Sequence, residues 1–595
     1  MEKLIDLISK EVKEAFEKAG YESSYGTVTV SNRPDLCEYQ CNGAMAVAKQ
    51  YHKAPIQIAS EVADNLNDNA VIDSAQAVNP GFLNINIRGG FLAGYLKDMS
   101  QCADGRFGLD DIGRGRKVVV DYGGPNAAKA LHVGHLRSAV IGEAVKRIFN
   151  YAGYDAIGDI HMGDWGLQMG LVITELKERF PDLPYFADSF EGEYPKEAPI
   201  TIEELGEIYP TAAGKAKVDP AYKDKAMEAT LKLQNGQRGY RALWKQIMDI
   251  SVANMKKIYD SLDVHFELWK GESDVQDIIP GMVSYLKDGG YAHMSEGALV
   301  IDVKEDTDTK EMPPCIVIKS DGASLYNTTD LATIMERTEK IDPVCMVYLT
   351  DKRQDLYFEQ VFRASRKSKL VKPDTELVHI GFGTVNGKDG KPFKTRDGGV
   401  MPLEMLIKDI NDRMYERILE NRDIDPDEAK SISNTVSLAA IKYGDLSNQA
   451  SKDYIFDVDK FTSSEGNTGP YILYTMVRIR SILAKYTEQG GSVPVLPSSD
   501  MEFIAPKSAS QKALMLALSG FAPVIEGACA EVAPHRICAY IYSLANAFNG
   551  FYHDTKILAC EDDKEKSGYI AILVLTLKIL EACIKMLGFD APSRM

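Results

Sequence analysis

The sequence predicts a multidomain α/β protein, with a small α+β domain, an open parallel sheet flanked by helices, and an all-α helical-bundle domain. The β-branched run 118–120 suits an interior parallel strand, and two glycines and a proline at 123–125 end it. Period-two alternation over 79–87 predicts a strand of the first domain. From about residue 402, long helical patterns replace glycine-punctuated strands and predict the third domain.

Length and composition allow three or more separate cores. The chain has 595 residues, of which 45% are hydrophobic, so it can bury several cores and is not a disordered protein. We expect domains at 1–112, 113–401 and 402–595. The stretch 105–115, rich in Gly, Arg and Asp, suits a linker between the first two.

The overall charge argues against bulk binding of polyanions. There are 68 basic and 86 acidic residues, which gives a net charge of −18. An RNA partner would therefore need local basic surfaces. The segment 361–372 is one candidate, although a charge run of this kind is usually a solvated helix face.

Cysteine usage and hydropathy predict a cytoplasmic protein. The nine cysteines include no Cys-x-x-Cys pair, so we expect reduced thiols and no structural metal. Residues 1–14 form an amphipathic helix rather than a signal peptide, because charges interrupt the apolar residues. The apolar stretch 569–577 is too short to span a bilayer and suits a buried terminal helix. We expect a monomer without membrane contacts.

Two stretches define the first domain. Residues 38–49 are expected to begin its middle helix, and the strand at 79–87 follows later in the same domain. Composition alone does not distinguish a binding domain from one that only covers the rest of the structure.

The turn after the strand at 118–120 is where chemistry is expected, because open α/β sheets hold ligands at such turns. The chain becomes helical from about Leu136. His132 and His135 flank Gly134 at the mouth of this helix, where free N–H groups favour an anion such as a nucleotide phosphate. Gly134 has no Cβ, so a flat base can approach the backbone. Taken alone, two histidines three residues apart are more often a chance pair.

The residues before this pair favour function over chance. Pro125-Asn126-Ala-Ala-Lys129 followed by His132-Val-Gly-His135 resembles the signature of class I aminoacyl-tRNA synthetases. The full lead-in is similar to that of arginyl-tRNA synthetases in particular. The resemblance implies a Rossmann-like class I synthetase catalytic domain over 113–401. It also implies a tRNA-contacting domain before this range and an anticodon-binding domain after it.

The next stretch predicts a second strand and then an insertion. Residues 155–160 form the strand pattern, and the glycine-punctuated loop 161–166 is similar to the pattern of the same family. From about 172 to 300 the sequence is charged and helix-forming, with few strand signals before 298–303. We expect an insertion here, a common place for contacts with the tRNA acceptor arm in class I synthetases.

The second half of the fold is expected to return with 315–330, where a strand and an Asp-Gly turn lead into a helix. Tyr326 and Asp330 are four residues apart at that helix start and can face one pocket. Alone, Asp330 is more often a helix-start acid, but Tyr-x-x-x-Asp matches where arginyl-tRNA synthetases hold the substrate side chain. The run 344–348 predicts another buried strand, and Gln354 matches the family's glutamine near the substrate.

A glycine-rich loop over 381–398 carries the cations Lys391, Lys394 and Arg396. Such a loop can close over a polyphosphate and neutralise the charge that builds on the leaving group. Most class I enzymes have Lys-Met-Ser-Lys here, whereas arginyl enzymes often lack it and resemble this sequence. Lys129 can share the task, so the lysine that touches the phosphates stays open.

The carboxyl-terminal helices carry a possible RNA surface. Tyr471, Tyr474 and Arg478 share one helical face and could stack on bases and pair with phosphates, although such tyrosines are more often core residues. The surrounding segment resembles the helical anticodon-binding domain of arginyl enzymes. In the first domain, the resemblance implies that Asn84 touches the tRNA.

The resemblance implies ligation of L-arginine to its cognate tRNA, with ATP as a substrate and Mg²⁺ bound to the ATP. The implied catalytic residues are Lys129, His132, His135, Lys391 and Lys394, and the ATP-binding residues are His132, Gly134, His135 and Lys394. The implied arginine-binding residues are Asp121, Asn126, His132, Tyr326, Asp330 and Gln354, and the tRNA-binding residues are Asn84, Tyr471, Tyr474 and Arg478.

Two rival hypotheses stay open. The first is another class I synthetase or a small nucleotidyltransferase that shares His-x-Gly-His, against which the paired acids and the long helical tail weigh. The second is a non-catalytic tRNA-binding relative. The intact pair His132 and His135 and the lysine-bearing loop argue against it.

Overall fold

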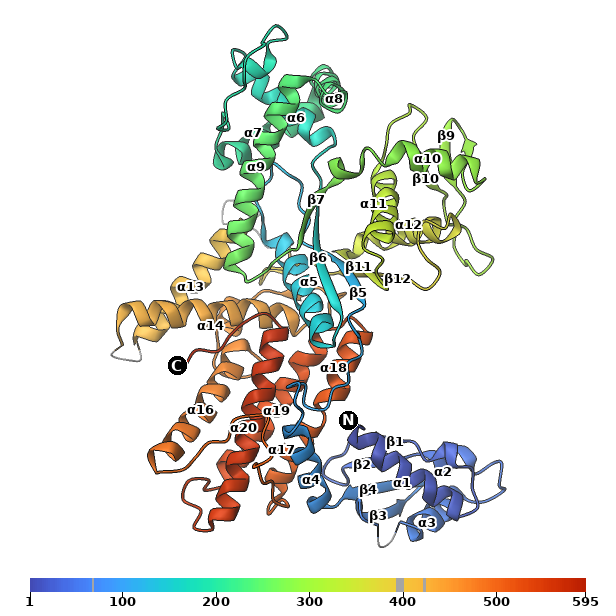
Figure 1. Ribbon diagram of the computed structural model, residues 1–595, viewed down its shortest axis with the longest axis vertical. Helices are drawn as coiled ribbons and strands as arrows, with labels where there is room; N and C mark the ends of the chain where they lie inside the picture. The colour runs from blue at the N-terminus through green and yellow to red at the C-terminus, as the bar shows by residue number, and fades with distance from the viewer. Residues whose placement is uncertain (67–68, 392–400, 421–423) are drawn as a thin grey trace.

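The computed structural model describes residues 1–66, 69–391, 401–420 and 424–595. Figure 1 shows an elongated molecule in which a central sheet lies between a helical bundle and two separate lobes. The small amino-terminal domain lies beside the bundle, at the end far from the lobes. Lys394 and Arg396 of the glycine-rich loop lie outside the described residues.

The amino-terminal domain is built on a four-stranded antiparallel sheet with the order β1-β2-β4-β3. The strand expected within 79–87 is confirmed as β4 (Phe82–Ile87). The helix expected to begin at 38–49 is wrong at its start, because β2 (Tyr39–Cys41) comes first and α2 covers only Gly43–Val47. A three-residue strand is too short to show its period in the sequence. The other elements are α1 (Leu4–Lys18), β1 (Val28–Val30), a 3-10 helix (Ser23–Tyr25), α3 (Pro55–Asp64), β3 (Ile72–Val78) and α4 (Gly89–Ser100).

The central sheet has five parallel strands in the order β12-β11-β5-β6-β7. β5 (Lys117–Asp121) is the middle strand, and its three valines are fully buried, as the β-branched run predicts. The helix after the turn, α5 (Val133–Tyr151), begins three residues before the expected start. The remaining strands are β6 (Asp155–Met162), β7 (Leu268–Gly271), β11 (Cys345–Asp351) and β12 (Glu376–Phe382).

Two strands need comment. The strand expected within 315–330 is present as β10 (Cys315–Ile318), and it joins β9 (Ala298–Ile301) and β8 (His293–Ser295) in a separate antiparallel sheet. β7 lies inside the range 172–300 that we expected to be an insertion, yet it is the edge strand of the central sheet. Its sequence Leu-Trp-Lys-Gly has no β-branched run, so the pattern did not indicate a strand.

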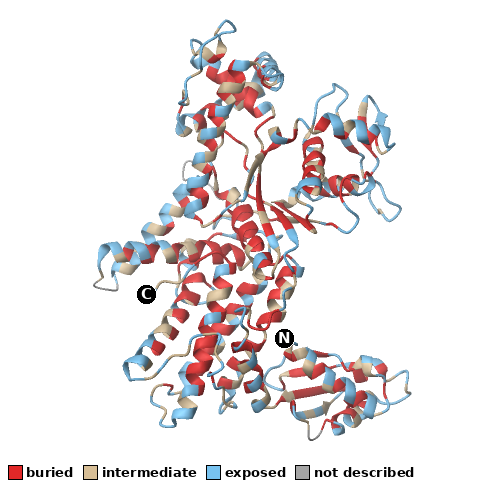
Figure 2. Cartoon of the chain, viewed as in Figure 1, coloured by how far each residue is buried: buried red, intermediate tan, exposed pale blue. Residues whose placement is uncertain are grey.

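The two lobes extend from the central sheet in different directions (Figure 1). One lobe is helical, and Figure 2 shows its buried residues gathered on the inner faces of the helices. It contains α6 (Leu167–Arg179), a 3-10 helix (Pro184–Phe186), α7 (Ile202–Val218), α8 (Pro220–Gln234) and α9 (Arg238–Ser261). The other lobe packs the small sheet with a 3-10 helix (Glu272–Val275), α10 (Ile279–Asp288), α11 (Tyr326–Lys340), a 3-10 helix (Lys352–Gln354) and α12 (Asp355–Lys367).

The carboxyl-terminal region is helical, as the sequence predicts. By length and composition, 509–530 and α20 could each cross a membrane, but 78% of the most apolar window of α20 is buried inside the protein. This confirms the expected buried terminal helix. The elements are β13 (Val385–Asn386), α13 (Leu403–Glu420), α14 (Pro426–Leu446), β14 (Tyr454–Ile455), α15 (Val458–Phe461), α16 (Gly469–Glu488), α17 (Ala509–Ser519), α18 (Phe521–Ala530), α19 (His535–Asp554) and α20 (Asp563–Met586).

A buried arginine fastens α5 to the helical domain. Arg137 Nη1 donates to the carbonyl oxygens of Gly383 and Lys452, each at 2.9 Å. Its Nε lies 3.3 Å from a carboxylate oxygen of Asp445 on α14, and both side chains are almost completely buried. The helix that the two histidines open is therefore tied to the first residues of the glycine-rich loop, to Lys452 and to α14.

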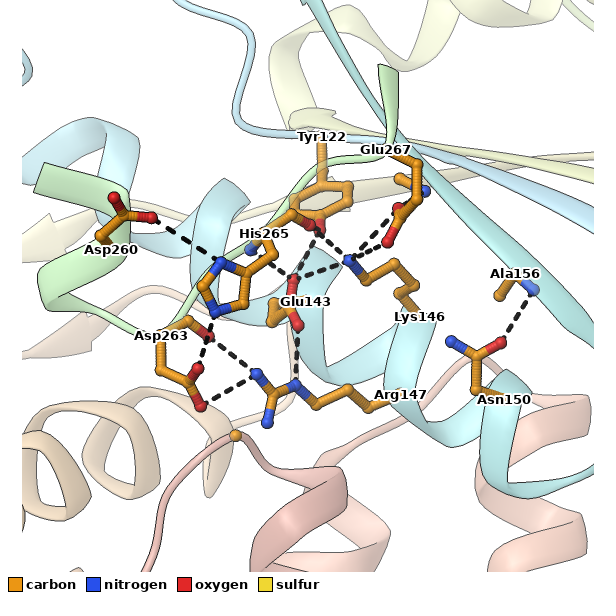
Figure 3. Close-up of polar contacts among 12 residues, drawn as sticks. Tyr122, Glu143, Lys146, Arg147, Asn150, Ala156, Asp260, Asp263, His265 and Glu267 are labelled. Atoms are coloured by element: carbon orange, nitrogen blue, oxygen red, sulfur yellow. Dashed lines mark hydrogen bonds and ion pairs between the residues drawn. The ribbon is translucent and has the colours of Figure 1, made fainter. Parts of the chain in front are cut away.

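A second polar cluster fastens the other side of α5 (Figure 3). Tyr122, just after β5, donates its hydroxyl to Glu143 at 2.7 Å, and Arg147 bridges Glu143 at 2.7 Å and Asp263 at 2.9 Å. Lys442 of α14 donates to the carbonyl of Asp263 at 3.0 Å. Burial, together with the charge of Arg147, lowers the pKa of Lys442 to about 7. The cluster thus fixes three separate chain segments on one helix.

Candidate functional site

The two histidines form the cap of the helix that they open. His132 is the N-cap residue of α5, and its Nδ1 accepts the N–H of Gly134 at 3.1 Å. The backbone N–H of His132 donates to Nδ1 of His135 at 3.0 Å, and the ring centroids lie 3.9 Å apart. Because each Nδ1 accepts a hydrogen bond, each neutral ring carries its proton on Nε2. The pair therefore offers Nε2–H donors at a helix N-terminus, where an anion is favoured.

Both rings are neutral at physiological pH. Burial lowers the pKa of His135 to about 3, and the charges of His132 and Lys129 add to this effect. Burial also lowers the pKa of His132, again with a contribution from Lys129. The histidines thus act as hydrogen-bond donors rather than as fixed cations.

The ring of His135 should stay neutral from pH 5 to 8.5 in the folded, ligand-free protein. In ¹³C-histidine NMR spectra, its Cε1–H resonance should not move across this range, because the folded-state pKa lies far below it. The same resonance in urea-unfolded protein should titrate near the ordinary histidine value of about 6.5. A His135→Gln sample identifies the resonance, and a midpoint between pH 6 and 7 in the folded state would contradict the neutral donor pair.

The ends of β5 and β6 meet at two glycines. A Cβ on Gly124 would lie 2.2 Å from the carbonyl oxygen of His161, and a Cβ on Gly163 would lie 2.3 Å from Oδ1 of Asn126. Asn126 also pairs with Gly163 in an isolated β-bridge. The turn that leads to the histidines therefore touches the loop after β6, at the edge of the sheet where open α/β folds hold ligands.

Three carboxylates and a histidine lie close together at this edge. Burial, together with the charges of Asp164 and Asp330, raises the pKa of Glu272, directly after β7, to about 8. Burial also raises the pKa of Asp164 and of Asp330. In the described part of the chain, none of the three forms an ion pair, and both ring nitrogens of the nearby His161 are buried without a hydrogen-bond partner. Such a cluster suits a cationic ligand.

Two tyrosines border these carboxylates. Tyr357 of α12 donates its hydroxyl to Asp330, and the pKa of Tyr326 is raised by partial burial and by the charge of Glu272. Tyr326 is 61% exposed at the first position of α11 (Tyr326–Lys340), one helical turn before Asp330, and the shared pocket of the two residues stays a prediction. Gln354 is exposed in the 3-10 helix that follows β11, and its substrate contact stays a prediction.

Sequence reasoning missed Glu272, His161 and Tyr357. Glu272 and Tyr357 belong to no motif, and His161 begins the loop 161–166 that was singled out without a role for its histidine. The three residues come from elements far apart in the chain. One signal was present: Glu272 follows Gly271 directly, at the carboxyl end of a parallel strand. Because β7 was not predicted, this signal could not be used.

Asp121 is not free to receive a guanidinium group. Its carboxylate accepts a hydrogen bond from Nη2 of Arg337 at 2.6 Å, and the same nitrogen donates to Asp159 at 2.7 Å. Arg337 and Asp159 are almost completely buried, so the protein already supplies the cation for this pair of acids. Asp121 therefore holds Arg337 on the sheet. Glu272 takes its place among the candidate residues for binding the arginine side chain.

The lysines predicted to contact phosphates differ in their exposure and in their neighbours. Lys129 is half-buried, lies close enough to affect the pKa of both histidines, and places its ammonium nitrogen 4.5 Å from the ring centroid of Tyr209. Lys391 is exposed, with its backbone N–H donating to Asp389 at 3.1 Å. Lys394 lies outside the described residues.

The predicted RNA surface on α16 is an exposed aromatic cluster. The guanidinium of Arg478 lies 4.8 Å from the ring centroid of Tyr474 and 5.3 Å from that of Tyr552 on α19. Both tyrosines are more than 40% exposed, whereas Tyr471 is bound through its hydroxyl to Asn546 at 2.6 Å. Tyr474 and Arg478 thus offer a face on which bases can stack, whereas Tyr471 serves mainly to join α16 and α19.

Asn84 lies on β4 and is 8% exposed. Its Oδ1 accepts a hydrogen bond from Gln40 at 2.9 Å, so much of its hydrogen-bonding capacity is used within the sheet. A contact of Asn84 with tRNA stays a prediction.

The nine cysteines are free thiols. Within residues 1–66, 69–391, 401–420 and 424–595, no group of three or more His, Cys, Asp or Glu side chains could hold a metal ion.

Three family models match the chain. Residues 2–87 match the arginyl tRNA synthetase N terminal domain, residues 103–458 match the catalytic domain of class I (R) tRNA synthetases, and residues 472–595 match the DALR anticodon binding domain. The three matches follow the order of the three structural parts described above.

Curated relatives and solved structures agree with these models. The chain is 61% identical to the arginine--tRNA ligase of Agathobacter rectalis over 601 residues and 52% identical to that of Alkaliphilus oremlandii over 595 residues, with 100% of both chains covered in each comparison. The arginyl-tRNA synthetase structure from Plasmodium falciparum has a TM-score of 0.81 at 24% identity, with 100% of both chains covered. The Thermus thermophilus structure has a TM-score of 0.77 at 20% identity, covering 99% of this chain and 100% of that one. At these identities the structures show the fold, while the full-length relatives show that this chain belongs to the arginyl-tRNA synthetase family.

Proposed function

We propose that the protein ligates L-arginine to its cognate tRNA in two steps. The arginine carboxylate attacks the α-phosphate of ATP and displaces diphosphate, and the 3′-terminal ribose hydroxyl of tRNA then takes the arginyl group and displaces AMP. The observation that carries this assignment is the cluster of Glu272, Asp330 and Tyr357, whose carboxylates form no ion pair with a cation of the described chain. A guanidinium group supplies that cation with bidentate geometry.

One group of residues binds arginine, and another stabilises the charge on the phosphate. Glu272 and Asp330 hold the guanidinium group, and Asn126, at the edge of the sheet, is placed to orient the α-amino end. The Nε2–H groups of His132 and His135 stabilise the negative charge that builds on the α-phosphate. The chemistry needs no protein nucleophile, because the substrate carboxylate attacks.

The leaving diphosphate requires positive charge. Lys129 supplies it from the turn, and Lys391 and Lys394 supply it from the glycine-rich loop. When Mg²⁺ is bound to ATP, it adds further positive charge at the phosphates. We also propose that the tRNA anticodon arm binds the helical domain near Tyr474 and Arg478, and that the enzyme works as a cytoplasmic monomer.

Charging of total tRNA tests the assignment. The protein is incubated with ATP, total tRNA and each labelled amino acid in turn, and acid-precipitable label should accumulate with arginine only. Lysine and citrulline test the guanidinium site. Lysine carries a point charge that cannot form a bidentate pair, and citrulline carries no charge on its side chain. Charging with another amino acid would favour the alternative of a different class I synthetase, and no charging at all would favour a non-catalytic relative.

A further inference from the structure

One aromatic side chain of the helical lobe reaches the turn between β5 and α5, which carries Lys129. Tyr209 of α7 places its ring centroid 4.5 Å from the ammonium nitrogen of Lys129, only three residues before His132. The same tyrosine contributes to the raised pKa of Tyr326, after the larger effects of burial and of Glu272. Tyr209 therefore contacts the lysine assigned to the phosphates and lies near Tyr326.

The local sequence gives Tyr209 an unusual place in its helix. Pro210 follows it inside α7 and cannot donate the backbone hydrogen bond that Gly206 would normally accept, so the helix loses one of its internal bonds here. Tyr209 is half-buried and packs against two neighbouring apolar clusters of the lobe, one of which contains Ala128. The ring is thus supported by the lobe on one side and meets the lysine on the other.

We infer that Tyr209 is a positioning residue for ATP activation, holding the ammonium group of Lys129 toward the phosphates. This inference rests on the proposed function. Lysine carries its charge on a flexible four-carbon stem, so a fixed aromatic face restricts where the charge can lie. The ring covers one side of the ammonium group and leaves its remaining N–H donors for the phosphate oxygens. The helical lobe in this way completes the ATP site.

A simple packing role makes different demands on the side chain. Packing against the lobe needs bulk, which leucine provides, whereas an attraction between cation and ring needs an aromatic face, which phenylalanine keeps. Tyr209→Phe should therefore resemble the wild type, and Tyr209→Leu should lose about two- to thirtyfold in kcat/KM for ATP, the range of such contacts from exposed to desolvated settings. The KM for arginine should change less than twofold.

The test is arginine-dependent exchange of diphosphate into ATP, measured for wild type, both Tyr209 variants, Lys129→Met and the double variant Lys129→Met/Tyr209→Leu. If the ring acts through the lysine, Tyr209→Leu should have no further effect once Lys129 is replaced. Tyr194→Leu is the matched control, because Tyr194 makes a similar contact with Arg238, at 5.2 Å, elsewhere in the lobe. If Tyr209→Leu fails to fold, Tyr209→Met replaces it.

Each outcome decides the inference. Equal values for Tyr209→Leu and wild type, a lower KM for ATP in Tyr209→Leu, or additive losses in the double variant would each overturn it. Equal losses in Tyr209→Leu and Tyr209→Phe would overturn it as well, since they would point to the hydroxyl. Absence of arginine-dependent exchange in the wild type, assayed with tRNA present, would instead contradict the proposed function.

Discussion

Glu272→Gln and Asp330→Asn should each lower kcat/KM for arginine by about two to three orders of magnitude. Each change leaves the guanidinium group with one buried carboxylate fewer, and breaking a buried charge pair costs about 3 to 5 kcal/mol. Steady-state charging assays with saturating ATP and tRNA measure the effect. The KM for ATP should change little, because neither residue contacts the phosphates in the proposed mechanism.

The pH dependence of the KM for arginine shows which carboxylate must lose a proton when arginine binds. With a pKa of about 8 in the empty pocket, Glu272 is mostly protonated at pH 7 and must lose this proton to pair with arginine. Raising the pH from 7 to 8.5 removes that cost, so the KM for arginine should fall over this range in the wild type. The fall should persist in Asp330→Asn and disappear in Glu272→Gln.

Glu336→Gln provides a matched control on the same helix as Asp330. Glu336 is a buried carboxylate of α11, but it is paired with Lys270 at 2.7 Å and Lys340 at 2.8 Å. Its replacement should lower thermal stability without changing arginine use. Unchanged kcat/KM in both Glu272→Gln and Asp330→Asn would show that the guanidinium group binds elsewhere.

The sequence predicted best what is local in the chain. The strand β5, its glycine turn and helix α5 follow one another within 35 residues, and buried valines, glycines and an amphipathic helix each have a local signature. The histidine pair was found for the same reason. The short strand β2 and the edge strand β7 were missed because neither is long enough or regular enough to show a period.

The arginine pocket could be predicted only in part, because burial and pairing are set by distant segments. Asp121 looked like a substrate acid until the fold placed Arg337, 216 residues away in the chain, against it. Glu272 lies in a charged segment whose sequence singles out no residue, and only the fold brings Asp164 and Asp330 near it. Only the spacing between Tyr326 and Asp330 lies within one helix, so it is the one part of the candidate pocket that a local pattern could indicate.

Replacing both histidines should lower the rate of arginine activation by about a thousandfold with little change in the KM for arginine. The double variant His132→Asn/His135→Gln tests this sharply, because Asn is a good N-cap residue and Gln suits the third helical position of a capping box. The start of α5 is thus preserved while both Nε2–H donors are lost. One donor to a developing negative charge is typically worth about a hundredfold or more, and neighbouring donors are not additive.

The capping role and the catalytic role can then be separated. His132→Ala removes the cap as well as the donor, so it should lower the thermal midpoint of unfolding, whereas the Asn/Gln variant should unfold close to the wild-type temperature. Single-turnover formation of arginyl-adenylate, followed by rapid quench, measures the chemical step directly. Nearly normal turnover in the Asn/Gln variant would mean that the histidines only shape the helix start. The charge on the phosphate would then be met by the backbone N–H groups of α5 and by the lysines, and the rate loss should move to Lys129→Met.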